Sequence, residues 1–303
     1  MRKQNIIGIL ILLLTSIIWG VAFVAQSVGT NHLNAFAFNC IRNSIGVVVL
    51  LPVLFGTRAT AKQPPAPLFT KDLLLGGLLC GISLFMGANF QQLGITYSTV
   101  GKSAFITTLY IIFVPILGIF LKKKAGFRVW CSVLLAMTGL FLLCMKNEVF
   151  VLEPADIYLL LSAFFFAVQI LCVDHFVHKT DSIALSIMQF FVTAVFSGVG
   201  MLFTEIPTWT DITNAAVPLL YAGAISSGVG FTLQIIGQKM LPSTVASLIM
   251  SLESVMAALA GWLLLQEVLS EKEIVGCALV FAAIILTQLP LKNIVPLLKA
   301  HKK

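Results

Sequence analysis

The chain has 303 residues, of which 59% are hydrophobic and only 10% are charged. A soluble globular domain carries about 25% charged residues, so the composition excludes that class and predicts an all-α integral membrane protein. The apolar runs reach about 20 residues, the length of a helix that crosses a bilayer, and they lack the alternation of membrane β-strands.

Ten apolar segments are expected to span the membrane as helices. In chain order they cover residues 6–25, 35–55, 73–94, 103–121, 129–145, 157–177, 183–203, 215–236, 245–265 and 274–291. No connection is long enough for a separate domain. The N-terminus resembles a signal peptide, but Trp19 and Phe23 stand where small residues should precede a cleavage site, so we expect an uncleaved first span.

Basic residues predict the orientation of these spans. With the N-terminus in the cytoplasm, fifteen of the 19 lysines and arginines fall on the cytoplasmic side. Lys102, Lys146 and Lys272 fall outside, and Arg42 lies within a span. The sequence therefore predicts a multi-pass protein of the cell membrane with both termini in the cytoplasm. The net charge of +7 is explained by orientation and anionic lipid, and a nucleic-acid partner is not expected.

The two halves of the chain match each other at a fixed shift. Matches of Gly, Ser and Gln are the informative ones, because Leu and Ile matches are common in so apolar a chain. A shift of 143 pairs Ser83 with Ser226, Gly87 with Gly230, Gln91 with Gln234 and Leu109 with Leu252, and a shift of 146 pairs Trp19 with Phe165. Each half has five spans, an odd number, so the halves insert in opposite orientations. The prediction is two inverted five-helix repeats, residues 1–147 and 148–303, an architecture common in secondary transporters.

Two ionisable residues lie near the middle of predicted spans. At a rise of 1.5 Å per residue, Glu253 lies about 12 Å into its helix and Arg42 about 11 Å into its own. An ionised side chain at mid-bilayer costs about 2.5–3.5 kcal/mol, so such residues are functional candidates. We expect Glu253 to be a protonatable or cation-binding group and Arg42 to be a structural or anion-facing charge. A structural ion pair between them remains the alternative.

Other candidates for a central site are the aromatic and polar side chains within the spans. The aromatic candidates for the cavity lining are Trp19, Tyr110 and Phe165, and the hydrogen-bonding candidates are Asn89, Gln92, Gln234 and Ser251. Further polar residues in the spans include Gln26, Gln91, Thr107, Gln169 and Ser226. For each Ser, Asn or Gln, static hydrogen bonding between helices is the alternative interpretation.

No cofactor, metal site or catalytic residue is expected from the motifs. The six cysteines form no CxxC pair, and Asp174, His175 and His178 have no further ligand nearby in sequence. The HExxH, GxSxG and phosphate-loop patterns are missing as well, so the chain is not expected to be an enzyme or to use ATP itself.

The combination of features resembles a known family. Two five-helix halves, Trp19-Gly20 in the first span, and Tyr110 with Pro115 in the fourth are similar to the drug/metabolite transporter superfamily, in its ten-helix branch with two EamA-type repeats. The resemblance covers residues 6–291. The chain departs from the family pattern at Ser254, where Pro is common, and at Gln266, where Gly is common. The resemblance implies transport of small metabolites, often amino acids and often outward.

The sequence thus predicts a secondary transporter, expected to be an exporter, of small polar organic metabolites such as amino acids, working by alternating access. Its partners would be the solute, the bilayer and a proton or another coupling ion, and the chain would be a monomer or a homodimer. Two alternatives stay open. The chain could be a non-transporting subunit of a larger membrane complex, or it could transport drugs or other cations.

Overall fold

The computed structural model describes residues 3–61, 67–123, 126–144, 153–266 and 271–288, and within these ranges the chain is helical and has no strand. The helices are α1 (Lys3–Gly29), α2 (Ala35–Ala59), α3 (Lys71–Thr96), α4 (Val100–Thr108), α5 (Tyr110–Phe120), α6 (Phe127–Cys144), α7 (Pro154–Phe176), α8 (Ser182–Phe203), α9 (Trp209–Asn214), α10 (Ala216–Leu220), η1 (Tyr221–Phe231), α11 (Thr232–Gln238), α12 (Ser243–Met250), α13 (Glu253–Leu265) and α14 (Glu271–Gln288).

Eight helical stretches in the described part of the chain are long and apolar enough to cross a membrane. Two further apolar stretches, Phe127–Gly139 in α6 and Ile274–Leu286 in α14, are shorter. Every predicted span overlaps one of these ten stretches, so the all-helical class is confirmed, whereas ten crossings stay a prediction. Length and composition support eight crossings directly. The predicted boundary between the halves, at residues 147 and 148, lies outside the described residues.

Two of the predicted spans are interrupted and a third changes its winding, which the sequence did not indicate. The fourth is split at Leu109 into α4 and α5, and the ninth is split at Ser251 and Leu252 into α12 and α13. The eighth changes its winding, because η1 is a π-helix between the α-helical turns of α10 and α11. Its first-half counterpart, α3, is α-helical throughout.

Polar residues at the ends of the apolar runs begin several helices. The Asn34 side chain accepts a hydrogen bond from the Ala37 amide at 2.8 Å and so caps α2. Thr70 caps α3 through the Leu73 amide, and Asp181 caps α8. Such caps satisfy amides that have no partner within the helix, which fixes where each helix starts.

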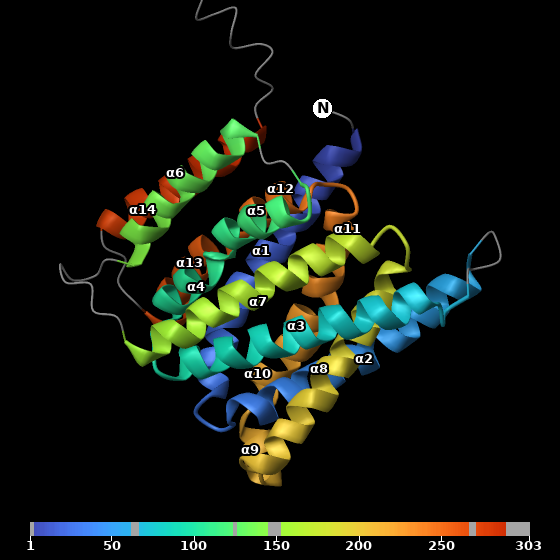
Figure 1. Cartoon of the computed structure of the whole chain (residues 1–303). Helices are drawn as coiled ribbons and strands as arrows, with labels where there is room; N and C mark the ends of the chain where they lie inside the picture. The colour runs from blue at the N-terminus through green and yellow to red at the C-terminus, as the bar shows by residue number, and fades with distance from the viewer. Residues whose placement is uncertain (1–2, 62–66, 124–125, 145–152, 267–270, 289–303) are drawn as a thin grey trace, which may run out of the picture.

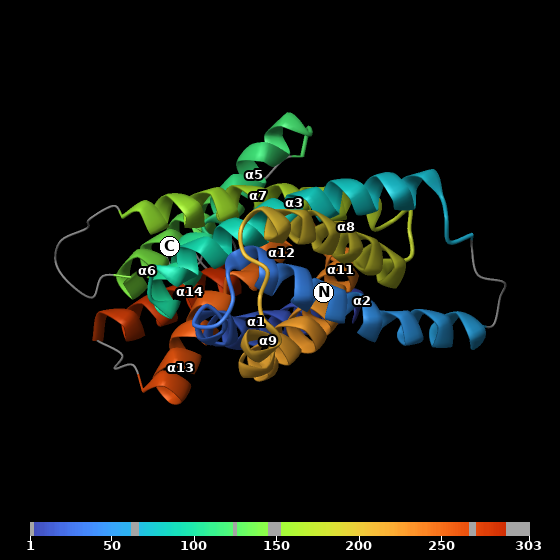
Figure 2. The same ribbon diagram turned by 90° about the horizontal axis from the view of Figure 1, so that it is seen from below.

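The helices pack as one bundle with α6 and α14 together along one side (Figure 1). Figure 2, seen from below, shows the same pair lying side by side. A Cβ atom added to Gly139 would lie 2.7 Å from the Gly276 carbonyl oxygen, so the two backbones are nearly in contact. α1 runs through the bundle and contacts helices of both halves, including α3, α4, η1 and α13.

The two ends of the bundle differ in charge. The basic end contains the end of α2, the start of α3, the turn between α7 and α8 and the end of α11, which all line one hollow. At the acidic end, Tyr97 after α3 lies beside Glu153 and the start of α7. The helix α3 therefore runs from the basic to the acidic end, whereas its counterpart ending in α11 runs the other way. Likewise α1 starts near the basic end, where Gly8 contacts Met240, and α7 starts at the acidic end.

Candidate functional site

A small cavity lies inside the bundle between helices of both halves of the chain. Its volume is about 30 Å³, which leaves room for about two waters. Its lining combines aromatic and aliphatic side chains with amide, hydroxyl and ionisable ones: Trp19, Ala22, Phe23, Gln26, Arg42, Gln91, Thr107, Tyr110, Phe166, Gln169, Ile170, Ser226, Phe231, Gln234 and Glu253. Apolar walls with a few converging polar groups are typical of a ligand site.

The two interrupted helices break at equivalent positions and in the same way. Leu109 and Leu252, which the shift of 143 pairs, have nearly equal backbone angles (φ −60°, ψ −5° and φ −60°, ψ −16°). Just before each break a hydroxyl group donates to the carbonyl oxygen three residues earlier. The Thr108 hydroxyl bonds the Phe105 carbonyl at 2.7 Å, and the Ser251 hydroxyl bonds the Leu248 carbonyl at 2.7 Å. Both pairs obey the same shift, so the breaks are a shared feature of the two halves.

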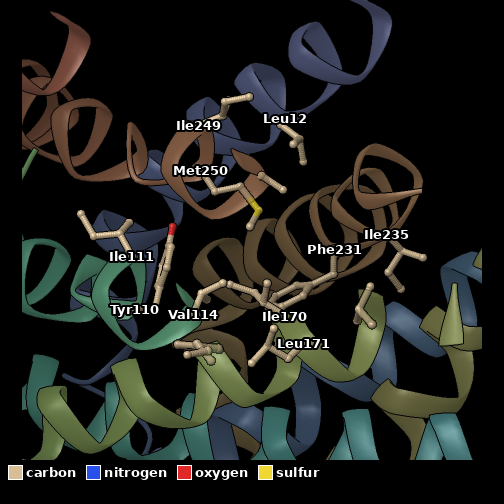
Figure 3. Close-up of a cluster of buried hydrophobic side chains, with 14 of the residues drawn as sticks. Leu12, Tyr110, Ile111, Val114, Ile170, Leu171, Phe231, Ile235, Ile249 and Met250 are labelled. Atoms are coloured by element: carbon tan, nitrogen blue, oxygen red, sulfur yellow. The ribbon is translucent and has the colours of Figure 1, made fainter. Parts of the chain in front are cut away.

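The first residue after each break faces the cavity. These residues are Tyr110 at the start of α5 and Glu253 at the start of α13, and they too are separated by 143 positions. Both side chains are buried, with exposed fractions of 2% and 4%. Figure 3 shows the Tyr110 hydroxyl pointing towards the ribbon near Met250. The hydroxyl and the Glu253 carboxyl lie close enough to interact electrostatically, but not in the geometry of a direct hydrogen bond.

Arg42 lies on the same cavity without contacting Glu253. The guanidinium donates a hydrogen bond to the Gln26 side-chain oxygen at 2.9 Å and lies 6.0 Å from the centre of the Phe38 ring. Its Nε atom is buried without a hydrogen-bond partner. The ion pairs found among the described residues do not include Arg42 with Glu253. The cavity therefore contains one basic and one acidic group that do not neutralise each other directly.

An aromatic wall closes one side of the cavity. Trp19 and Phe231 lie with ring centroids 4.6 Å apart, and the Trp19 indole N–H points to the Ser226 carbonyl oxygen at 3.4 Å. A Cβ atom added to Gly230 would lie 2.8 Å from the indole nitrogen. The glycine therefore leaves the space that the Trp19 ring fills against η1.

A chain of glutamine side chains links three helices beside the cavity. The Gln234 amide donates to the Gln169 oxygen at 3.0 Å, and the Gln169 amide donates to the Gln189 oxygen at 3.1 Å. Polar atoms without a partner remain at the cavity, namely the Gln234 oxygen and the hydroxyls of Thr107 and Tyr110. Buried polar atoms without partners are uncommon in folded proteins, so these groups are available to water or to a solute.

Of the predicted site residues, the structure brings Glu253, Arg42, Trp19, Tyr110 and Gln234 to the cavity. The others lie elsewhere. Asn89 bonds Asn39 and the Ser197 hydroxyl, and so links α2, α3 and α8. Gln92 donates to the Gln26 backbone carbonyl, and Ser251 donates within its own helix.

Phe165 also lies outside the cavity lining, where it stacks on Phe90 with centroids 5.9 Å apart. The next residue, Phe166, lines the cavity instead. The glycine contacts explain this difference, because Trp19 packs on Gly230 and Phe166 packs on the equivalent Gly87. These contacts make Phe166 the counterpart of Trp19, one residue further than the shift of 146 predicts.

Several cavity residues were absent from the predicted set, among them Gln26, Gln91, Gln169, Phe166 and Phe231. Three of them are amides within apolar spans, which was the signal available for finding them. Whether these amides or those of Asn89 and Gln92 line the cavity depends on which face of each helix turns inward. That rotation is set by the neighbouring helices, which the sequence does not show. In the described part of the chain, no group of three or more His, Cys, Asp or Glu residues is placed to hold a metal ion.

Comparison with known proteins gives relatives over nearly the whole chain. A protein named "Uncharacterized transporter" from Archaeoglobus fulgidus is 29% identical over 280 residues, covering 92% of this chain and 84% of the relative. The "Uncharacterized transporter YoaV" of Bacillus subtilis is 24% identical over 275 residues, covering 89% of this chain and 92% of the relative. A solved crystal structure aligns with a TM-score of 0.75 at 15% identity, covering 92% of this chain and 96% of that chain.

At 15% identity the solved structure supports the fold alone, whereas the family comparison goes further. The model of the EamA-like transporter family matches this chain twice, over residues 6–145 and 153–289. Each match covers one of the halves that the shift of 143 relates. The chain therefore belongs to the EamA-like transporter family, within the superfamily that its sequence resembles.

Proposed function

We propose that the chain is a secondary transporter of small zwitterionic metabolites such as amino acids, and that it exports them. The observation behind this proposal is the central cavity, where Arg42 and Glu253 are both buried and are not paired. A solute with a carboxylate and an ammonium group would complement both charges. The carboxylate would bind the Arg42 guanidinium, and the ammonium would bind the Glu253 carboxyl group.

Alternating access follows from the architecture that we propose. The chain would form ten spans in two inverted five-helix halves, residues 1–147 and 148–303, with both termini in the cytoplasm of a cell-membrane protein. The opposite directions of α3 and the α10–η1–α11 helix support this proposal. In this conformation the cavity has room for about two waters, so the helices must separate before a metabolite can enter. The equivalent breaks at Leu109 and Leu252 are suitable points for such a movement.

Glu253 is also the candidate for coupling transport to a proton or another cation. It is the acidic residue in the cavity lining, and the Tyr110 hydroxyl lies beside it. A carboxyl group binds a proton or an ammonium group but not both at the same oxygen, so proton uptake and ammonium binding can compete at this position. We propose that the solute's ammonium group and the proton bind Glu253 alternately.

The test is transport by the purified chain in proteoliposomes, with Glu253→Gln and Arg42→Gln compared with wild type. The solutes are a neutral amino acid, its amide without the carboxylate and its analogue without the amino group. Losing a hydrogen bond to a charged group costs about 1.5–3 kcal/mol, which corresponds to about a 10- to 150-fold loss of kcat/KM. Arg42→Gln should lose the preference for the amino acid over its amide. Glu253→Gln should lose the preference over the deaminated analogue, together with gradient-driven flux.

A Gln92→Leu variant is the matched control, because Gln92 is buried near the site but does not line the cavity. It should keep the preference among the three solutes. Equal preferences in all variants, each folded by size-exclusion chromatography, would contradict the zwitterion proposal. A chain that transports nothing until other subunits are added would instead support the subunit alternative.

A second candidate, transport of organic cations, is favoured by the aromatic wall next to Glu253. Trp19 and Phe231 lie together on the cavity, and aromatic faces attract cations. The same experiment separates the candidates. A cation transporter should carry the amide at least as well as the amino acid, and Arg42→Gln should leave that transport intact.

A further inference from the structure

A second and larger hollow lies at the basic end of the bundle, away from the central cavity. Its volume is about 440 Å³, by the same measure that gives about 30 Å³ for the central cavity. The lining comes from the end of α2, the start of α3, the turn between α7 and α8 and the residue after α11: Thr57, Arg58, Ala61, Pro67, Leu68, Thr70, Leu73, His178, Lys179, Thr180, Asp181, Ala184 and Lys239. None of these residues lines the central cavity.

The hollow gathers positive charge from three separate parts of the chain. Arg58 comes from α2, Lys179 from the turn after α7, and Lys239 from the position after α11. The carboxylate among the lining residues belongs to Asp181, and one of its oxygens accepts the amides of Ile183 and Ala184 at 2.9 Å each. That acid is thus engaged in capping α8, and cationic groups outnumber acids around the hollow.

Two side chains at the end of α7 contact Lys179. Its ammonium group lies 2.9 Å from the Nε2 atom of His175 and 5.7 Å from the centre of the Phe176 ring. Both Lys179 and Lys239 are exposed, so a ligand in the hollow can reach them. An ammonium group held in place loses less freedom on binding an anion than one on a free side chain.

Orientation alone explains basic residues at one end of a membrane protein, but it does not require them to surround one hollow. Lys122, at the end of α5, is exposed and does not line the hollow. The meeting of Lys179 and Lys239, from separate parts of the chain, around a common space that Arg58 also lines therefore needs a further reason. A compact anion with several acceptor oxygens provides one, since ammonium and guanidinium groups bind phosphate oxygens by charge-assisted hydrogen bonds.

We propose that this hollow binds a phosphate group, carried by an anionic phospholipid headgroup or by a small soluble phosphate compound. Exposed apolar side chains close to it in sequence favour the lipid. Phe55 is 60% exposed, Phe69 is 80% exposed and Leu74 is 47% exposed, on the segments that provide Thr57, Thr70 and Leu73. Basic pockets between the ends of membrane helices bind lipid headgroups in this way.

The experiment measures binding to the purified full chain in detergent by thermal unfolding and by native mass spectrometry. The probes are dioleoylphosphatidylglycerol, dioleoylphosphatidylcholine, and inorganic phosphate against chloride at equal ionic strength. Phosphatidylcholine controls for the acyl chains and for a phosphate in a headgroup without net charge. A saturating ligand should raise Tm by about 3 °C or more and give a bound adduct in the mass spectrum.

The key variant is Lys179→Gln/Lys239→Gln, and the matched control is Lys122→Gln/Lys272→Gln, which removes the same charge from exposed lysines outside the hollow. The first should lose the shift and the adduct, and the second should keep both. Lys179→Arg/Lys239→Arg keeps the charges and should keep binding. A response to phosphatidylglycerol alone identifies a lipid headgroup, and a response to inorganic phosphate identifies a soluble ligand.

Two results would overturn the proposal. One is an equal response of the hollow and control variants to every probe. The other is an equal response of the wild type to phosphatidylglycerol and phosphatidylcholine with no response to phosphate. Neither measurement involves transport, so the result does not depend on which solute crosses the central cavity.

Discussion

Arg42 is only 2% exposed, and its side-chain hydrogen bond in the described structure goes to Gln26 at 2.9 Å. Replacing Gln26 with Leu would leave the guanidinium without this partner. Losing a hydrogen bond to a charged group costs about 1.5–3 kcal/mol, so Gln26→Leu should be destabilised by that amount. The measurement is the unfolding free energy of the purified chain in detergent.

The control is the double variant Gln26→Leu/Arg42→Met, which removes the charge as well as its partner. It should regain most of the lost stability, because replacing a whole buried polar pair by apolar groups is often neutral or favourable. Strictly additive losses in the double variant would show that the two side chains act independently.

For single residues, the sequence did not predict which of several neighbouring side chains faces the cavity. Three phenylalanines occur in a row at positions 164–166, and successive residues of a helix point about 100° apart. A repeat shift wrong by one residue therefore moves the chosen side chain from the cavity to another face. Gly87 and Gly230 give the correct register, but only through the aromatic rings that pack on them. Those contacts are not readable from the chain alone.

At the scale of helices, the breaks at Leu109 and Leu252 occur without the usual sequence signals. Proline is the strongest helix breaker, yet Pro52 and Pro115 lie inside α2 and α5. The breaks instead contain Thr108 and Ser251, whose hydroxyls bond local carbonyl groups, and such residues are common in unbroken membrane helices as well. The predicted spans were therefore found in the right places, while their interruptions were missed.

Close packing of α1 on α13 gives a prediction at this scale. A Cβ atom added to Gly20 would lie 2.3 Å from the Met256 Cβ atom and 2.7 Å from its backbone carbon. Because the backbone cannot easily yield, Gly20→Ala should force the helices apart and lower stability by about 1–3 kcal/mol. Thermal unfolding in detergent measures the change.

Gly56→Ala is the matched control, since Gly56 lies within α2 and a Cβ atom there meets nothing within 4 Å. It should be neutral or stabilising by up to about 1 kcal/mol, because Ala is the better helix former. Similar effects of the two substitutions would show that the contact between α1 and α13 is looser than described.

For the whole molecule, the apolar runs of the sequence predicted the order of the helices, and the bias of basic residues predicted which helix ends share one side of the bundle. Arg58, Lys179 and Lys239 come together at one end in the structure, and Glu153 and Asp156 lie at the other. Charge bias works at this scale because it depends on which loops share a side, and not on how each helix is rotated. The predicted location of the termini falls on residues outside the described ranges.

The orientation can be tested on described residues. In a cysteine-free background, Thr210→Cys in α9 and Thr60→Cys after α2 place single thiols at exposed positions of the acidic and basic ends. A maleimide that cannot cross membranes should label Thr210→Cys in intact cells. It should label Thr60→Cys only after the cells are opened. The reverse pattern would overturn the orientation and place the hollow of the basic end outside the cell.

The equivalence of Tyr110 and Glu253 has a consequence for a chain built from two copies of one design. A carboxyl group at both positions would put two like charges close together in a buried space, where they repel each other. A phenol at both positions would leave this pair of sites uncharged at neutral pH. With Glu253 at one position and Tyr110 at the other, the pair has one carboxyl group and a neutral hydroxyl beside it. The two halves therefore share a backbone break but differ in the side chain that follows it, at a place where two identical side chains would hinder each other.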